Sequence, residues 1–378
     1  MSQSSPQRQP IRAAVLRQSG DQLQFEAASL EEPRSNEVLV RLVATGVCHT
    51  DMVVRDQFFK TPMPMILGHE GSGVVERIGS DVTTVVPGDH VVMTYMSCGL
   101  CDPCVTGHPA HCEHMGLLNF GGSRMDGTSS ACDAHGGELH DHFFGQSSFA
   151  TYAIASERNV VKVRKDVPLE LLGPLGCGIQ TGSGAVLNAL KVHAGSSFAA
   201  FGTGAVGIAA LMAARVAGAT TIIAVDVNPD RLALALELGA THAINSRDVN
   251  PIEEIRRITS GGADFTLECS GRAEVLRQAI DALATLGTCG IVGATREGTE
   301  ASFNVNDVMI PGRRIMGIVQ GDVVSRTFIP ELIELYRQGR FPFDRLVKFY
   351  RFDELNQAMA DSESGVTIKP ILRFTEAA

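Results

Sequence analysis

Hydrophobic and polar residues follow two different patterns along this chain. In the first third, short β-rich stretches are bounded by Gly, Pro or Asp, which is typical of strands joined by turns. The clearest of these stretches are residues 11–16, 37–45, 73–78 and 90–93. We therefore expect a barrel-like β domain in this part of the chain.

From about residue 169 the pattern changes. Apolar strands now alternate with Ala/Leu-rich helical segments, as in βαβ units that build a parallel sheet. The expected strands are residues 197–201, 221–225, 265–268 and 290–293, and the expected helices between them are 205–217, 231–238 and 274–286. Two further helices (328–337 and 353–361) and a final strand (367–374) complete the pattern.

These patterns predict a split organisation. A chain of 378 residues is long enough for two domains of about 100 to 200 residues each. We expect a β domain built from residues 1–180 and 322–378, with a nucleotide-binding domain of residues 181–321 inserted between them.

The net charge of the chain limits the classes of partner that it is expected to bind. The formal net charge is −10, which argues against long-range attraction to nucleic acid or to an anionic membrane. No charged segment followed by an apolar run opens the sequence, and the most apolar stretch, residues 205–219, is interrupted by Arg215. We expect a cytoplasmic protein with a small neutral substrate.

A glycine-rich motif marks the nucleotide site. Gly202, Gly204 and Gly207 form G-x-G-x-x-G, with Val206 inside it, after an apolar strand and before an Ala-rich helix. The first glycine permits a tight turn, the second lets the backbone approach a pyrophosphate, and the third allows close packing of helix on strand. The helix N-terminus then binds the phosphates.

Asp226 indicates which dinucleotide binds. It ends the next strand about 20 residues further on, where a carboxylate can accept hydrogen bonds from the adenosine ribose hydroxyls. No cation follows it in Val227-Asn228-Pro229 to neutralise a 2′-phosphate. NAD is therefore favoured over NADP. The alternative is that Asp226 only caps the helix that begins near Pro229.

Four cysteines form a compact metal-binding motif. Cys98, Cys101, Cys104 and Cys112 follow the pattern C-x2-C-x2-C-x7-C. Four thiolates complete the tetrahedral shell of zinc and leave no position for a substrate, so this site is expected to be structural. Iron–sulfur ligation is the alternative for such spacing.

A second possible metal site is scattered along the sequence. Cys48, His69 and Cys177 would make a Cys2His set with one open position, as in catalytic zinc sites, and Glu70 adjoins His69. Each residue is ambiguous by itself, because a cysteine is often a core residue and a histidine often serves a turn.

Several segments together resemble the zinc-containing medium-chain dehydrogenase/reductase family over essentially the whole chain. They are residues 42–51, 67–75, 98–112, 144–152, 171–182 and 341–350. Within that family the sequence is most similar to bacterial aryl-alcohol (benzyl alcohol) dehydrogenases. The resemblance implies an α/β protein with a GroES-like β-barrel catalytic domain and a Rossmann doubly wound parallel sheet.

The resemblance also implies roles for single residues. Cys48, His69 and Cys177 would ligate the catalytic zinc, with Glu70 behind it and Asp51 orienting His69. Thr50 would hydrogen-bond the alcohol oxygen and begin a proton relay. The coenzyme would lie near His49, Lys369 and Thr181. Some relatives end the relay at a histidine that is Val53 here, which leaves His49 or water as the terminal acceptor.

The implied reaction is oxidation of a primary alcohol, aryl, benzylic or allylic, to an aldehyde, with two zinc ions per chain and NAD. Alternatives are a glutathione-dependent formaldehyde dehydrogenase or an aldehyde reductase of the same family, and, from another class, a catalytically silent zinc-binding structural protein. We also expect a homo-oligomer, a dimer or tetramer.

Residues 117–146, with Phe120, Phe143 and Phe144, are expected to line or cover part of the substrate pocket. The histidines of this segment, His135, His140 and His142, are interpreted as solvated loop residues rather than a third metal site.

Overall fold

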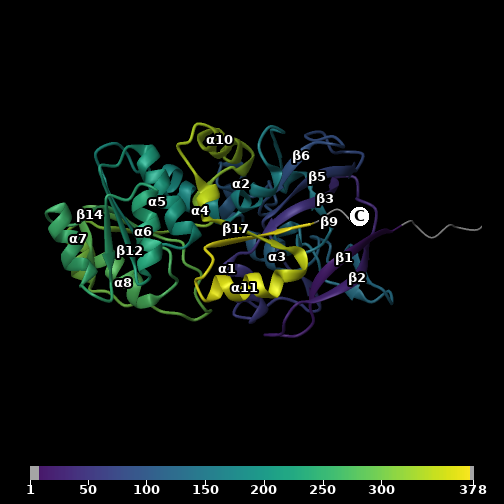
Figure 1. Ribbon diagram of the computed structural model, residues 1–378, viewed down its shortest axis with the longest axis horizontal. Helices are drawn as coiled ribbons and strands as arrows, with labels where there is room; N and C mark the ends of the chain where they lie inside the picture. Colours follow the sequence, from purple (N-terminus) through teal and green to yellow (C-terminus); the bar gives the residue numbers. More distant parts are fainter. Residues whose placement is uncertain (1–7, 375–378) are drawn as a thin grey trace, which may run out of the picture. The chain divides into compact units, whose positions relative to one another are not determined.

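The computed structural model describes residues 8–374, which form two compact units (Figure 1). The first unit runs to Cys177, takes in Val324–Glu331 and resumes at Asp344. The second comprises Gly178–Val323 and Leu332–Phe343. The domain boundaries expected from the sequence, at 180/181 and 321/322, differ from those of the structure mainly at residues 332–343, which belong to the second unit. Helix α10 (Ser325–Arg337) crosses this division.

Two β-sheets build the first unit, with strands taken from both ends of the sequence. The five-stranded sheet has the order β4 (Met65–Ile66), β1 (Gln9–Leu16), β2 (Gln24–Leu30), β7 (Ala131–Asp133), β8 (Glu138–Leu139). The seven-stranded sheet has the order β10 (Val160–Val163), β6 (His90–Met93), β5 (Gly71–Ile78), β3 (Glu37–Gly46), β18 (Lys369–Arg373), β17 (Val347–Arg351), and β9 (Tyr152–Ser156) pairs with β3.

Strand β3 is the centre of this unit. Its nearly continuous apolar sequence suits a strand covered on both faces, and eight of its ten residues are buried. It pairs antiparallel with β5, β9 and β18. The pairing of β3 with β18 joins the C-terminal segment to the N-terminal one, as the split β domain predicted from the sequence requires.

A parallel six-stranded sheet builds the second unit. Its order is β13 (His242–Asn245), β12 (Thr221–Asp226), β11 (Ser197–Phe201), β14 (Ala263–Glu268), β15 (Leu283–Ile291), β16 (Arg314–Gly317). Helices α5 (Ala205–Ala217), α6 (Pro229–Glu237), α7 (Pro251–Thr259) and α8 (Ala273–Asp281) connect the strands. The first strand and helix lie where the sequence pattern predicts them.

One pair of boundaries was wrong. The predicted helix 274–286 ends at Asp281, and the predicted strand 290–293 begins at Leu283 as part of β15. Leu283 is fully buried and pairs with Ala263 of β14. A register shift then separates the pair Ala263–Leu283 from the pair Phe265–Thr288. Leu283 therefore belongs to the sheet although the sequence pattern places it in the helix, and the residues between the two pairings form an irregularity in β15, where Leu286 has φ +63°.

The remaining helices are shorter or lie at the edges of the units. They are α1 (His49–Arg55), α2 (Asp102–Val105), α3 (Met115–Phe120), α4 (Gly178–Gly184), α9 (Val305–Met309) and α11 (Leu355–Glu363). The predicted helix 353–361 is a short 3-10 turn (Phe352–Glu354) followed by α11. Among residues 8–374, no helix combines the length and the apolarity that a membrane crossing needs.

Candidate functional site

The scattered ligand set of the sequence comes together in the first unit. Cys48 directly precedes α1. His69 and Glu70 lie in the turn between β4 and β5, and Cys177 ends the long N-terminal segment of the first unit. One potential ligand atom from each of the four lies within 4.8 Å of the others. His69 and Glu70 are fully buried and Cys177 is 6% exposed. Residues separated by more than 100 positions therefore form one cluster.

Asp51 holds the imidazole of His69 in a fixed orientation. Its Oδ1 lies 3.0 Å from Nδ1 of His69 and also accepts a hydrogen bond from the Gly68 N–H. Its Oδ2 accepts from the Cys48 N–H at 2.9 Å. A carboxylate on one ring nitrogen fixes the tautomer, so that the other nitrogen presents its lone pair. Asp51 thus lies where the resemblance assigned it.

The second ring nitrogen of His69 has no protein partner. Nε2 is buried and makes no hydrogen bond to any described residue. Burial alone would lower the pKa of His69, but the charges of Asp51 and Cys48 raise it to about 10. The cluster therefore favours a cation at Nε2, and a metal ion competes with a proton for that lone pair. A hydrogen bond with Cys177 and the positive charge of His69 lower the pKa of Cys48, although burial opposes this.

Two thiolates and one oriented imidazole fit zinc. The set supplies three protein ligands and leaves a fourth position open, which distinguishes a catalytic site from a closed structural one. Glu70 is the fourth member of the cluster.

Lys369 lies beside Glu70. Its Nζ donates to both carboxylate oxygens of Glu70, at 2.9 and 3.0 Å, and to the Val47 carbonyl at 3.1 Å. Lys369 is 3% exposed, and burial lowers its pKa while Glu70 raises it, for a net value above its usual range. The lysine assigned to the coenzyme pyrophosphate is thus ion-paired behind the metal cluster, and its coenzyme contact stays a prediction.

Thr50 is the hydroxyl nearest to the cluster on α1. Its Oγ1 lies 3.8 Å from Sγ of Cys48, and the residue is half-buried. Its neighbour His49 is exposed, whereas Val53 is buried at 4% exposure. Thr181 is half-buried on α4 in the second unit, and its predicted position near the nicotinamide stays a prediction.

Aromatic rings pack directly on the zinc-ligand candidate. The Phe144 ring stacks on the His69 ring with centroids 4.4 Å apart, and the Phe143 ring meets it edge-on at 5.3 Å. Phe120 contacts both phenylalanines. The sequence predicted these three rings to lie near the substrate, and the structure adds that two of them contact His69 itself.

Gln146 was missed in the sequence. Its Nε2 donates to the His69 carbonyl at 3.0 Å and its Oε1 accepts from the Gly71 N–H at 3.1 Å. It is 1% exposed. A glutamine that follows two phenylalanines gives no sequence signal of this kind, because its partners lie 75 and 77 positions earlier in the chain.

The four-cysteine motif folds into a compact lobe. One ligand atom from each of Cys98, Cys101, Cys104 and Cys112 lies within 4.8 Å of the others. All nine cysteines of the chain are free thiols, so none of these four is in a disulfide. The N–H groups of Leu100 and Cys101 donate to Sγ of Cys98 and lower its pKa to about 6. Amide donors to thiolates suit a closed tetrathiolate zinc site.

The glycine-rich motif opens α5 as predicted. Gly202 has φ +96°, which favours glycine, and a Cβ on Gly207 would lie 1.9 Å from the Gly202 carbonyl oxygen. A Cβ on Gly204 would meet no protein atom within 4 Å. Val206 lies in the first turn of α5. The open side of Gly204, next to the N–H groups of a helix start, suits a phosphate group.

Asp226 ends β12 and is engaged with the glycine-rich turn. Its Oδ2 accepts from the N–H and hydroxyl of Thr203 at 2.6 and 2.7 Å, and its Oδ1 accepts from the Val227 and Asn228 N–H groups. Burial raises its pKa, but these hydrogen bonds lower it overall. The helix cap considered in the sequence analysis is instead Asn228, which accepts from the Asp230 and Arg231 N–H groups.

Family profiles match both parts of the chain. The profile described as "Alcohol dehydrogenase GroES-like domain" matches residues 34–165, and the profile described as "Zinc-binding dehydrogenase" matches residues 205–338. The predicted GroES-like barrel and Rossmann sheet are thereby confirmed as the fold class.

Three relatives align over nearly the full chain. A geraniol dehydrogenase of Castellaniella defragrans is 46% identical over 96% of this chain and 97% of that protein. The crystal structure of a zinc-binding alcohol dehydrogenase domain protein from Burkholderia ambifaria has 59% identity and a TM-score of 0.97, covering 98% of this chain and all of that one. The crystal structure of benzyl alcohol dehydrogenase from Acinetobacter calcoaceticus has 53% identity and a TM-score of 0.95, covering 97% and 100%.

Proposed function

This chain belongs to the zinc-containing medium-chain dehydrogenase/reductase family, and we propose that it oxidises benzylic or allylic primary alcohols to aldehydes with NAD. Zinc-dependent alcohol dehydrogenase activity follows from the family and from relatives that act on alcohols. The coenzyme, the substrate class and the residue roles are the content of the proposal.

The observation that carries the proposal is the buried cluster of Cys48, His69, Glu70 and Cys177. A purely structural metal site would be closed. This set offers two thiolates and one oriented imidazole, and both carboxylate oxygens of Glu70 already accept from Lys369, which leaves a fourth position open. The four-cysteine lobe is the closed site, so the chain would hold two zinc ions with different tasks.

Zinc bound at this cluster would act as a Lewis acid on the oxygen of the alcohol. The protein's own groups then handle position and proton. Asp51 keeps Nδ1 of His69 occupied, and Lys369 balances the charge of the buried Glu70. Thr50, beside Cys48, takes the proton from the alcohol hydroxyl while passing its own proton outward. Val53 cannot continue that transfer, so we assign the next step to the exposed His49 or to water.

Two observations support benzylic or allylic substrates. Phe143 and Phe144 pack on His69 and Phe120 packs on both of them, and aromatic rings pair favourably with other flat, unsaturated groups. Two of the three relatives named above are a geraniol dehydrogenase and a benzyl alcohol dehydrogenase; geraniol is an allylic alcohol.

NAD would supply the hydride acceptor, bound at the glycine-rich turn. A carboxylate at Asp226, with no cation in the three residues after it, disfavours a 2′-phosphate on the ribose. The existing hydrogen bonds of Asp226 fix its carboxylate at the end of β12 and keep it charged.

The test is a steady-state screen of benzyl alcohol, geraniol and linear alcohols, each with NAD and with NADP. We expect kcat/KM to be highest for the benzylic and allylic alcohols with NAD. A preference for linear alcohols would overturn the substrate class, and equal use of NADP would overturn the coenzyme assignment. Activity only with a glutathione adduct of formaldehyde would favour the related formaldehyde dehydrogenase.

A further inference from the structure

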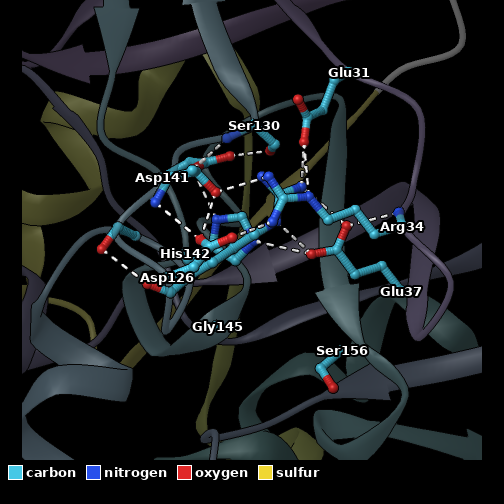
Figure 2. A network of polar contacts seen from close by, with 12 residues as sticks. Glu31, Arg34, Glu37, Asp126, Ser130, Asp141, His142, Gly145 and Ser156 are labelled. Atoms are coloured by element: carbon cyan, nitrogen blue, oxygen red, sulfur yellow. Dashed lines mark hydrogen bonds and ion pairs between the residues drawn. The ribbon is translucent and has the colours of Figure 1, made fainter.

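A buried network of charged side chains lies in the first unit, outside the metal cluster. His142 Nδ1 is 2.7 Å from Asp141 Oδ1, and its Nε2 is 3.9 Å from Glu37 Oε1. Arg124 pairs with the same Glu37, with Nη2 to Oε2 at 2.9 Å. Figure 2 shows Asp141 and His142 on one side and Glu37 on the other. His142, predicted to be solvated, is therefore a buried ion-network residue, whereas His135 is exposed as expected.

The network reaches two further parts of the first unit, at Ser130 and at Arg34. Asp141 accepts from the N–H of Ser130 at 3.1 Å and from its hydroxyl. Glu37 accepts from the Arg34 N–H at 2.9 Å. Glu37 is the first residue of β3, the central strand. The network thus ties the loop after β8 to the centre of the sheet.

These groups are charged at neutral pH. Burial opposes the charge of His142, but the negative charge of Asp141 prevails and raises its pKa to about 9. Burial also opposes ionisation of Glu37, yet the neighbouring imidazole of His142 and the hydrogen bonds from Arg124 lower its pKa to about 2. A buried imidazolium between two carboxylates is geometrically restricted, because moving it would leave buried charges unpaired.

The backbone that follows has an uncommon conformation. His142, Phe144 and Ser147 have φ of +64°, +52° and +49°. Residues with a Cβ are strained in this region and persist there only where the surrounding structure holds them. Ser147 is held by its hydroxyl, which donates to the Ile66 carbonyl and accepts from the Phe143 N–H. At the other end of the segment, the charged network holds His142.

This segment is the one that contacts His69. The Phe144 ring stacks on the imidazole, and Gln146 binds the His69 carbonyl and the Gly71 N–H. Two residues further on, the Ser148 N–H donates to the Gly68 carbonyl at 2.8 Å. The orientation of His69 therefore depends on the segment as well as on Asp51.

There is room for the segment to relax. A cavity of about 340 Å³ is lined by residues that include Glu37, Arg124, His142, Gly145, Met96 and Cys98. A segment without its clamp could move toward this space and carry Phe144 away from His69.

We propose that His142 is a positioning residue for His69, clamped between Asp141 and Glu37 so that the segment 142–147 keeps Phe144 and Gln146 against the metal ligand. This role rests on the metal centre of the proposed function. It does not require His142 to contact substrate, coenzyme or metal.

The test measures release of zinc from the intact protein to a chromogenic chelator, which needs no turnover. The variant Cys177→Ala identifies the phase that belongs to the cluster, because it removes a ligand there. His142→Asn accepts the left-handed conformation but loses the charge, and we expect it to speed that phase by about 10-fold or more, as loss of groups behind metal ligands commonly does. His135→Asn, in the exposed turn between β7 and β8, is the matched control and should leave it unchanged.

A double-mutant cycle separates positioning from general destabilisation. Phe144→Leu should also speed release, and the double variant His142→Asn/Phe144→Leu should be no faster than the faster single variant, because both changes act on one path. Glu37→Gln removes the carboxylate that faces His142 from β3, so it should speed zinc release as His142→Asn does. It therefore tests the same contact if His142→Asn folds poorly. In cobalt-substituted protein, the visible absorption bands should shift in both clamp variants and not in His135→Asn.

Three results would overturn the inference. If His142→Asn and Glu37→Gln both released zinc at the wild-type rate, the network would have no positioning role. If the rate increases of the two single variants multiplied in the double variant, His142 would not act through Phe144. A release profile that is unchanged by Cys177→Ala would instead refute the metal centre itself, and this inference with it.

Discussion

At the scale of single residues, two neighbours on α1, Thr50 and Asp51, have different tasks beside the cluster of Cys48, His69, Glu70 and Cys177. Asp51 is fully buried and bound on both oxygens, so it can orient His69 but has no freedom to exchange protons with an alcohol. Thr50 is half-buried beside Cys48 and carries a hydroxyl that both donates and accepts. The proton relay therefore begins at Thr50 in the proposed reaction.

Replacement of Thr50 tests this relay. Thr50→Val keeps the shape and removes the hydroxyl, so kcat for benzyl alcohol should fall by about 10²-fold or more, the usual contribution of positioned proton transfer. Thr50→Ser should keep much of the activity. Protiated and α-deuterated benzyl alcohol report whether hydride transfer is being measured. Near-normal hydride transfer in Thr50→Val would show that Thr50 only packs beside the metal.

Replacement of Asp226 tests the coenzyme assignment. Asp226→Ser removes the charge that would repel a 2′-phosphate, so the ratio of kcat/KM for NAD over NADP should fall by about 10-fold or more. Because Asp226 also binds Thr203 of the glycine-rich turn, Thr203→Val is the control for a loosened turn. If both variants weaken NAD equally and neither changes the ratio, Asp226 only supports the turn.

His142 should make stability depend on pH. Its pKa is about 9 in the folded protein and about 6.5 when unfolded, so its contribution is fully present below pH 6.5 and is lost as pH rises through 9. Asp141 and Glu37 stay ionised in this window, and Arg124 stays charged. The free energy of unfolding should therefore fall more steeply from pH 6.5 to 9 in wild type than in His142→Asn. Parallel curves from denaturant titrations would contradict a charged His142.

At the scale of elements, the four-cysteine lobe comes from one segment of the chain, whereas the cluster of Cys48, His69, Glu70 and Cys177 comes from several. The lobe is one short segment around α2, with amide donors from neighbouring residues. The cluster draws on the start of α1, the turn before β5 and the end of the first unit's main segment. A local site supplies folding free energy to its own segment, whereas the cluster depends on sheets that are already formed.

Two cysteine variants should separate these sites. Cys177→Ala should abolish turnover with a small change in Tm, because the sheets do not need that ligand to fold. Cys104→Ala should first lower Tm, because a closed zinc site stabilises the lobe directly. Thermal melting and zinc content are followed together. If Cys104→Ala melted like wild type but lost only the chemistry, the two roles would be reversed.

At the scale of the whole molecule, the zinc content follows from the two clusters. Metal-replete protein should contain two zinc ions per chain, one at each set of four residues found among residues 8–374. Elemental analysis measures this number. One zinc per chain, or iron with acid-labile sulfide, would contradict the assignment of the four-cysteine motif. The expected homo-oligomer stays a prediction.

Local motifs were predicted well from the sequence. The cysteine lobe, the glycine-rich turn and α5 each depend on residues close together in the chain, and their spacing alone constrains the geometry. Boundaries that depend on strand pairing were predicted less well, as at Leu283, where β14 draws helical-looking residues into β15. The cluster of Cys48, His69 and Cys177 was found through family resemblance, since no local spacing joins residues so far apart.

The sequence by itself determined the fold class, the two sets of candidate metal ligands and the nucleotide motif, because these follow from periodicity, short spacings and the resemblance they carry. Only the tertiary structure decided that Lys369 pairs with Glu70, that Gln146 binds the His69 carbonyl and that His142 is a buried ion rather than a solvated loop residue. The physical reason is that burial and charge pairing depend on which distant segments pack together. A histidine directly before two phenylalanines looks the same in sequence whether water or a carboxylate surrounds it.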